Sequence, residues 1–325
     1  MNEKSITVGR ERDNSRGIGR VHLQDSERER LKARVKQWRA AFSDDTTGIE
    51  RTLDDLLWSY ACFRTVIKIV SLANQKRVPD RPPLNQMIFD LIADGYWSRL
   101  LLGLRRLLDP ACIAGKKGVY SVRSVISDIK LCAPKITRRV YVELVWEAKY
   151  DLERMERDEY ERLLEGAKTR TVVWGDPDLM RSRMAHDHFD VLSGTDRNAR
   201  REGDLLAIAI LDKAEARLAK LDHIKEHVSS HLAHAGNAES RDGKLLDQFD
   251  IRTARECLKE LKQLADLIGM LFTKGGGAGL ATFIGDQFAG LDEPLAGPDE
   301  IKELEKNWRE IDRDIASWSI SPSEL

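Results

Sequence analysis

Hydrophobic residues recur at intervals of three and four along most of the chain, which is the spacing of amphipathic helices. One such segment starts near residue 25, and a second covers residues 53–70 before a run of prolines ends it. A third, from about Leu84 to Leu108, is rich in leucine and isoleucine and predicts a central, well-buried helix. No series of alternating apolar and polar residues indicates strands. The pattern therefore predicts an all-α helical bundle.

Further helices are predicted in the second half of the chain, separated by segments of weaker pattern. Helical spacing recurs over residues 204–235 and 247–272, and again after Pro298. Residues 137–167 predict one long charged helix, because acidic and basic side chains alternate along much of it. Residues 171–203 contain scattered glycine and proline and predict an irregular insertion that serves as a long connection or a lid.

The two ends of the chain differ in composition from its middle. Residues 1–24 set arginines among glycines without any apolar period, so they predict a disordered basic arm. Residues 25–272 contain the predicted bundle. Residues 273–325 begin with a glycine-rich stretch, which predicts a hinge followed by C-terminal helices.

The charge and cysteine content narrow the classes of partner. The chain of 325 residues has 53 Lys and Arg against 54 Asp and Glu, so no global positive field attracts nucleic acid or anionic lipid. Its four cysteines lie far apart, which argues against a disulfide framework and a thiolate zinc site. No apolar run is long enough for a membrane span or a signal peptide. We therefore expect a cytoplasmic protein with no membrane partner.

Four of the seven histidines fall within twelve residues: His223, His227, His231 and His234. At about 100° per residue they form one stripe of a helix, beside the apolar arc of the same helix. If that helix runs unbroken from residue 213, lysines and an arginine adjoin the stripe, and no acidic residue of the helix falls on it. The stripe is thus locally basic in a neutral protein.

Three interpretations of this stripe remain open. The histidines are half-buried structural residues of the bundle, or some of them bind a metal ion with ligands from elsewhere, because one straight helix cannot surround a tetrahedral centre. Alternatively, they perform acid/base chemistry on a phosphate-containing substrate. Imidazole exchanges protons near neutral pH, and neighbouring Lys or Arg neutralises the phosphate.

The stretch from His227 to His234, His-Val-Ser-Ser-His-Leu-Ala-His, resembles the signature of the HEPN superfamily, an Arg followed after four to six residues by a His. Its His-Leu-Ala-His ending is most similar to the abortive-infection branch. Residues 100–110, which end Arg-Arg-Leu-Leu-Asp-Pro, are similar to the preceding family helix. The resemblance covers roughly residues 48–272 and implies a HEPN-type bundle, here with additional N- and C-terminal helices.

The resemblance also implies a function and a set of site residues. Many HEPN members are homodimeric, metal-independent RNA endonucleases acting as toxins or antiviral effectors, which makes RNA and an antidote protein the expected partners and requires no cofactor. His234 would then be the general acid/base, helped by His231 and His227. The family Arg would fall at 227, 228 or 229, where this chain has His, Val and Ser. The missing charge would come from Lys220, Arg217, Arg105 or Arg106.

Two alternatives to a nuclease follow from the same residues. Without the motif arginine, the chain is instead a non-catalytic HEPN module that binds RNA or protein. In a different class, it is a histidine-rich, metal-binding bundle. A separate segment, His186-Asp187-His188-Phe189-Asp190, matches the start of an HxHxDH metal motif but has Val191 in the last position. For that segment we predict a solvated turn or the start of a helix.

Overall fold

The computed structural model describes residues 25–75, 85–172, 174–229, 249–280, 286, 288–291 and 298–317. The predicted basic arm, residues 1–24, lies outside this part of the chain. Contacts divide the chain into two compact units, Met1–Leu280 and Ala281–Leu325, and each is described by itself. Within the described residues the structure is helical and has no strand; one isolated bridge joins Thr137 and Leu205. The predicted all-α class is confirmed.

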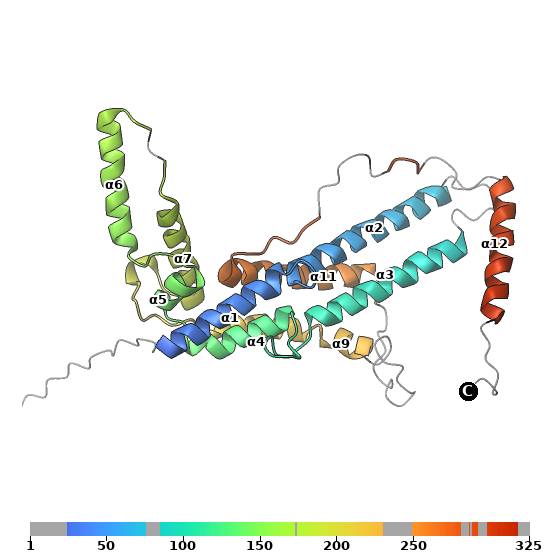
Figure 1. Cartoon of the computed structure of the whole chain (residues 1–325), viewed down its shortest axis with the longest axis horizontal. Coiled ribbons are helices and arrows are strands. Elements are labelled where there is room, and N and C mark those ends of the chain that lie inside the picture. The colour runs from blue at the N-terminus through green and yellow to red at the C-terminus, as the bar shows by residue number, and fades with distance from the viewer. Residues whose placement is uncertain are drawn as a thin grey trace, which may run out of the picture. The chain divides into compact units, whose positions relative to one another are not determined.

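The helices of the first unit follow one another along the chain as Figure 1 shows. They are α1 (Asp25–Ser43), α2 (Ile49–Gln75), α3 (Gln86–Leu107), α4 (Val122–Cys132), α5 (Arg138–Val140), α6 (Leu152–Thr169), α7 (Pro177–Ser193), α8 (Ile208–Ala219), α9 (Asp222–Val228) and α11 (Ile251–Ile268). A π-helical turn follows α5 at Tyr141–Val145, and another follows α11 at Gly269–Thr273.

One apolar core holds these helices together. α2 packs along α3, α11 packs against both, and α1 crosses next to α4. The core includes Trp38, Leu53, Leu104 and Leu261, all fully buried. The indole of Trp38 donates to Asp128 Oδ2 at 2.7 Å, which satisfies its N–H inside the core. Burial of such apolar side chains is the main contribution to the stability of a helical bundle.

The sequence predicts that α3 is buried along its whole length, but only its C-terminal half is buried. In its C-terminal half Leu100, Leu104 and Leu107 are fully buried. In its N-terminal half Ile88 and Leu91 are exposed, so the prediction of a well-buried helix is wrong there. Leucine and isoleucine content alone does not reveal whether a second element covers each face of a helix.

The single helix predicted for residues 137–167 is also wrong. The chain forms α5 and a π-helical turn, then breaks at Trp146 and Glu147 before α6 begins at Leu152. Glu147 has a φ of 52°, which a continuing right-handed helix excludes. The side chain of Asp151 then caps α6 by accepting from the N–H of Arg154 at 3.1 Å. The apolar turn is buried, whereas α6 is mostly exposed.

The predicted irregular insertion at 171–203 contains a regular helix, α7, so this prediction needs correction. Asp176 caps its start by accepting from the N–H of Asp178 at 2.9 Å, and Pro177 is its first residue. Gly194 ends it in a left-handed conformation, with a φ of 68°. Proline and glycine therefore mark the two ends of a helix here, rather than a loop. α7 lies beside α6 (Figure 1).

The glycine-rich stretch after α11 is fastened to the first unit. Backbone N–H groups of Gly276, Gly277 and Gly279 donate to the carboxylates of Glu50, Asp266 and Asp54, respectively. Gly276 has a φ of 101°, a conformation that favours glycine. The two units divide only after Leu280. Bending of the chain in this region stays a prediction.

The second unit contains α12 (Pro298–Ser317). Ile301, Leu304, Trp308 and Ile311 recur along one face of this helix, and all are exposed. Most of the segment predicted to form the other C-terminal helix lies outside the described residues, and its residues 288–291 form a turn. In the part of the chain that the structure describes, no helix combines the length and the apolar content needed to cross a bilayer.

Candidate functional site

α9 carries the first half of the histidine stripe. Its apolar residues Ile224 and Val228 are fully buried, while His223 is exposed and His227 is half-buried. The half-buried position of His227 agrees with the prediction that the histidines flank the buried face of their helix, whereas His223 lies exposed. His231 and His234 lie outside the described residues, so their positions stay predictions.

The helix that bears the stripe does not run unbroken from residue 213. α8 ends at Ala219, and Leu221 has φ −98° and ψ 2° before α9 begins at Asp222. The basic residues of α8 thus belong to a different helix from His223 and His227. The predicted extension of the stripe through Lys213, Arg217 and Lys220 on one continuous helix is wrong.

Arg105 is the predicted phosphate-binding residue that the fold brings to the motif. α3 packs along α9, and Arg105 Nε donates to Ser229 Oγ at 3.0 Å. Position 229 is one of the three positions at which the HEPN signature would have its arginine. Because Leu104 and Leu107 anchor this part of α3 in the core, the guanidinium is held beside the motif by a rigid element.

The other predicted phosphate-binding residues have different surroundings. Arg106 donates to the backbone carbonyl of Thr47. Arg217 contacts Glu260 with two nitrogens, one of them Nη2 at 2.9 Å, and its hydrogen bonds to Glu260 raise the pKa of Arg217. Lys220 is exposed at the end of α8. An acidic residue of α11 therefore faces Arg217, which the sequence of α8 and α9 alone did not reveal.

An ion pair that sequence analysis missed anchors the start of α9. Arg123 of α4 contacts Asp222 at 2.7 Å, and Lys225 of α9 lies 3.7 Å from the same carboxylate. Asp222 is the first residue of α9, where a negative charge favours the helix dipole. These contacts fix the start of the helix that leads into the motif. No sequence pattern linked Arg123 to a position 99 residues away.

The structure gives no metal centre among the residues it describes: no three or more His, Cys, Asp or Glu side chains converge there. His231 and His234 lie outside those residues. The four cysteines are not paired with one another.

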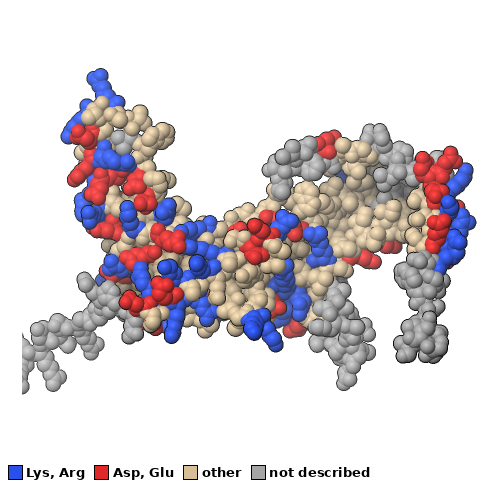
Figure 2. All heavy atoms as spheres, in the orientation of Figure 1, with Lys and Arg blue, Asp and Glu red and all other residues tan. Residues whose placement is uncertain are grey.

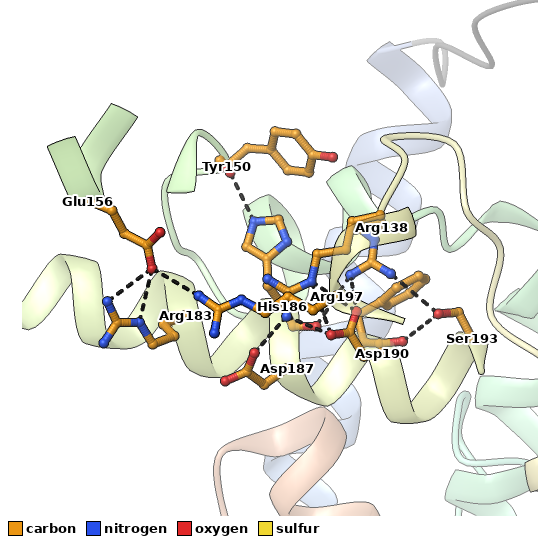
Figure 3. Close-up of polar contacts among 11 residues, drawn as sticks. Arg138, Tyr150, Glu156, Arg183, His186, Asp187, Asp190, Ser193 and Arg197 are labelled. Carbon is orange, nitrogen blue, oxygen red and sulfur yellow. Dashed lines mark hydrogen bonds and ion pairs between the residues drawn. The ribbon is translucent and has the colours of Figure 1, made fainter. Parts of the chain in front are cut away.

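The His186–Asp190 segment lies inside α7, so the predicted solvated turn or helix start is wrong. His186 is buried, and its Nε2 lies 2.9 Å from the backbone carbonyl oxygen of Tyr150 (Figure 3). Burial lowers the pKa of His186, with a smaller opposing effect from that hydrogen bond. A neutral imidazole that donates from Nε2 to the carbonyl fits this environment.

The acidic residues of the same segment bind arginines rather than a metal. Arg138 is fully buried and donates to Asp190 at 2.7 Å and to Asp204 at 3.0 Å (Figure 3 shows Arg138 with Asp190 and Ser193). Arg200 bridges Asp187 and Asp190, both at 2.6 Å. Burial raises the pKa of Asp190, but hydrogen bonds from Arg200 and Arg138 leave it below its usual value. The network fastens α7 to the segment before α8.

Comparison with known families identifies the class of this protein. A family model for AbiU2, a HEPN family, matches residues 33–257, which is more than half of the chain. The chain therefore belongs to the AbiU2 family and is a HEPN-type protein of the abortive-infection group. No curated protein matches the chain significantly, and no solved structure does. The matched region includes α3, α9 and the motif segment up to His234.

Proposed function

We propose that this protein acts on RNA as a metal-independent endoribonuclease in which Arg105 supplies the charge that the motif lacks. The contact between Arg105 Nε and Ser229 Oγ, at 3.0 Å, carries this proposal. It joins a permanently charged guanidinium to a position where the family signature has its own arginine. Arginine binds phosphate with a planar pair of N–H groups, which histidine does not offer.

The proposed chemistry divides the work between the guanidinium and the histidines. Arg105 neutralises the phosphate, and Lys220 adds charge at the end of α8. His234 exchanges a proton with a ribose 2′-hydroxyl or with the leaving oxygen, while His231 and His227 assist it. Stabilising the developing negative charge is the larger contribution in reactions of this kind. Neither role needs a cofactor.

The proposal includes partners that fit such an activity. We propose a homodimer in the cytoplasm and an antidote protein that holds its activity in check. A charge-neutral chain has no global field for RNA, so binding depends on local groups such as Arg105.

The test is incubation of the purified chain with total RNA, with and without EDTA, followed by mapping of the fragment ends. We expect cleavage that EDTA does not stop and that the pair of substitutions His231→Ala and His234→Ala abolishes. His223→Ala is the matched control, because it removes an exposed imidazole of the same stripe that has no role in the proposal. Circular dichroism verifies that all variants fold.

A second candidate is a HEPN module that binds RNA without cutting it. It is favoured by the sequence itself, since His227, Val228 and Ser229 occupy all three positions of the motif arginine. RNA that is retained but stays intact would select this function over the nuclease. One Zn²⁺ bound per chain after purification would select the metal-binding bundle instead.

A further inference from the structure

The last turn of α6 and the loop that leads to α7, residues 166–175, form a segment that we call the α6–α7 connection. It has no acidic residue, although α6 itself is rich in them. Its basic side chains Lys168 and Arg170 are exposed, and so is Trp174. Figure 2 shows blue and tan atoms at the free end of α6, whose course can be followed in Figure 1. The connection is therefore a small cationic and aromatic surface in a chain with no net positive charge.

The indole of Trp174 lies in solvent although its backbone is fixed. Trp174 is 83% exposed, more than any other large apolar side chain in the part of the chain that the structure describes. Its carbonyl oxygen accepts a hydrogen bond from Arg162 Nη2 at 2.6 Å, which ties the loop to α6. Contact of so large an aromatic surface with water is unfavourable. The loop thus presents a ring face that a ligand from outside can cover.

Arg170 occupies a backbone position that glycine fills at the end of the next helix. Arg170 caps α6 in the left-handed conformation, with a φ of 54°, and Gly194 caps α7 with a φ of 68°. A side chain makes this conformation less favourable, so glycine is the usual residue there. Lys168 already supplies a positive charge to the C-terminus of α6, where it favours the helix dipole. Among the described residues, no carboxylate pairs with the guanidinium of Arg170. Neither the backbone nor an ion pair of the described fold therefore accounts for an arginine at this position.

The chemistry of the connection fits single-stranded nucleic acid better than a membrane. A base stacks on the face of an indole, and a guanidinium binds a nearby phosphate with a planar pair of N–H groups. Membrane binding grows with the apolar area that is buried, and here that area consists mainly of Val172 and Trp174. Glu165 and Asp176 border the connection and would face the negative charge of lipid headgroups. A narrow single strand needs only the connection itself.

We propose that the α6–α7 connection is a second contact for single-stranded RNA, in which Trp174 stacks on a base and Arg170 binds a phosphate. The RNA is single-stranded because only unpaired bases offer a free face to the indole. The connection shares no helix with the motif, whose described residues lie on α3 and at α9, so the two contacts are separate. The inference rests on the proposed function for its ligand. It needs no cleavage, because the connection holds RNA whether or not the motif cuts it.

The first test is the affinity of the full-length chain for a fluorescent single-stranded RNA, methylated at its 2′-hydroxyls so that it is not cut. Trp174→Ala should weaken binding about 5- to 150-fold through loss of one stacked base, with an unchanged dependence on salt. Arg170→Gly should weaken binding and reduce the slope of log affinity against log salt concentration by about 0.7, because one phosphate contact is lost. Tyr160→Ala and Arg157→Gln are the matched controls, since both remove exposed side chains of α6 outside the connection. Equal effects of the variants and their controls would overturn the contact.

Thermal unfolding of the same variants separates binding from a role in folding. Arg170→Gly removes the side chain that disfavours the left-handed conformation, so its unfolding midpoint should equal or exceed that of the unmutated chain. Trp174→Ala should leave the midpoint unchanged, because the indole is exposed. A lower midpoint for Arg170→Gly would assign this arginine to the fold and overturn its part in the contact.

Cross-linking locates the contact on the chain. Ultraviolet irradiation with the same RNA, followed by trypsin, should place an adduct on the peptide of residues 171–181, which contains Trp174. Vesicles of phosphatidylserine and phosphatidylcholine are the competing ligand, and binding to them that requires Trp174, without an RNA adduct, would overturn RNA as the ligand. An adduct on this peptide in a chain that leaves unmodified RNA intact would contradict only the proposed nuclease. Cleavage of RNA without the adduct would contradict only the second contact.

Discussion

Two arginines of this chain have opposite surroundings. Arg138 is fully buried and donates to the carboxylates of Asp190 and Asp204 and to the carbonyl of His186. Arg105 is half-buried, and among the described residues its hydrogen-bond partner is the neutral hydroxyl of Ser229. The first guanidinium has its charge balanced within the fold. Among the residues that the structure describes, no carboxylate bonds to the second, so its charge is available for the phosphate of the proposed function.

The difference separates a structural arginine from a functional one. Removing a buried charge from its partners leaves those partners uncompensated, which strongly destabilises a protein. A half-buried arginine beside a hydroxyl contributes little to folding but remains available for a phosphate. Stability and RNA binding should therefore respond in opposite ways to substitution of the two residues.

The largest effect is expected from Arg138→Met. This change leaves Asp190 and Asp204 partly buried without their shared guanidinium and should lower the free energy of unfolding by about 3–5 kcal/mol. Arg139→Met is the control, because Arg139 pairs with Glu143 and Glu202 near the surface and should cost about 0–1 kcal/mol. Urea denaturation measures both. Equal losses would show that burial does not distinguish the two pairs.

Gly103→Ala tests whether the C-terminal half of α3, which carries Arg105, is packed tightly into the core. A Cβ at Gly103 would lie 2.6 Å from Leu56 Cδ2, so the core must shift, at a cost of about 1–3 kcal/mol. Gly95→Ala in the exposed half of the same helix meets no neighbour and should stabilise the chain by up to about 1 kcal/mol. Thermal unfolding compares the two. Opposite signs are expected, and equal shifts would contradict the assignment of a buried and an exposed half.

A smaller effect on the free energy of unfolding is expected when the pH is lowered, because His186 and Asp190 lie next to Arg138 and titrate differently in the folded and unfolded chain. The pKa of His186 is lowered by burial, so the folded state favours neutral imidazole. Its contribution to stability is present above the unfolded pKa, about 6.5, and is lost as pH falls below it. Asp190, whose pKa is also lowered, adds a further loss below about pH 4. Urea denaturation at pH 7, 6 and 5 should show decreasing stability. His186→Gln should flatten that decrease, and an unchanged slope would exclude His186 as its source.

Ser229→Ala should have the smallest effect on stability. It removes one hydrogen bond to a half-buried guanidinium, worth about 0.5–1 kcal/mol. The charge of Arg105 remains, so RNA binding should persist with a modest loss. A complete loss of RNA binding in a folded Ser229→Ala chain would shift the role from the guanidinium to the hydroxyl. Chemical denaturation and RNA titration of the same preparation separate the two outcomes.

Local signals in the sequence predicted the fold class but not the detail of α7. The spacing of apolar residues was sufficient for an all-α bundle, because each helix buries one face. In the sequence alone, Pro177 and Gly194 favour a loop, whereas in the structure they are the first residue and the C-terminal cap of a helix. The same proline and glycine are therefore compatible with a loop and with the two ends of a helix. Only the packing of Phe189 and Leu192 into the core decides between them.

Only part of the candidate site can be predicted from the sequence, because local spacing predicts burial along one helix but not which side chains of distant helices meet. The helical spacing of apolar residues along α9 is sufficient to predict that Ile224 and Val228 are buried and that His227 lies beside them, half-buried. The choice among Arg105, Arg106, Arg217 and Lys220 depended on contacts between distant helices. Adjacent residues of α3 point to different neighbours, Arg105 to Ser229 and Arg106 to Thr47. A single sequence contains no signal for that difference.

The most direct measurement of the central claim is the affinity of Arg105→Gln for a fluorescent single-stranded RNA, compared with the unmutated chain. Arg157→Gln, which removes an exposed arginine of α6, is the matched control. Loss of a charge-assisted contact to phosphate, worth about 1.5–3 kcal/mol, should weaken RNA binding by about 10- to 150-fold in Arg105→Gln alone. The unfolding free energy of both variants should stay within about 1 kcal/mol of the unmutated chain. Unchanged affinity in a folded Arg105→Gln chain would contradict the claim that Arg105 supplies the missing charge.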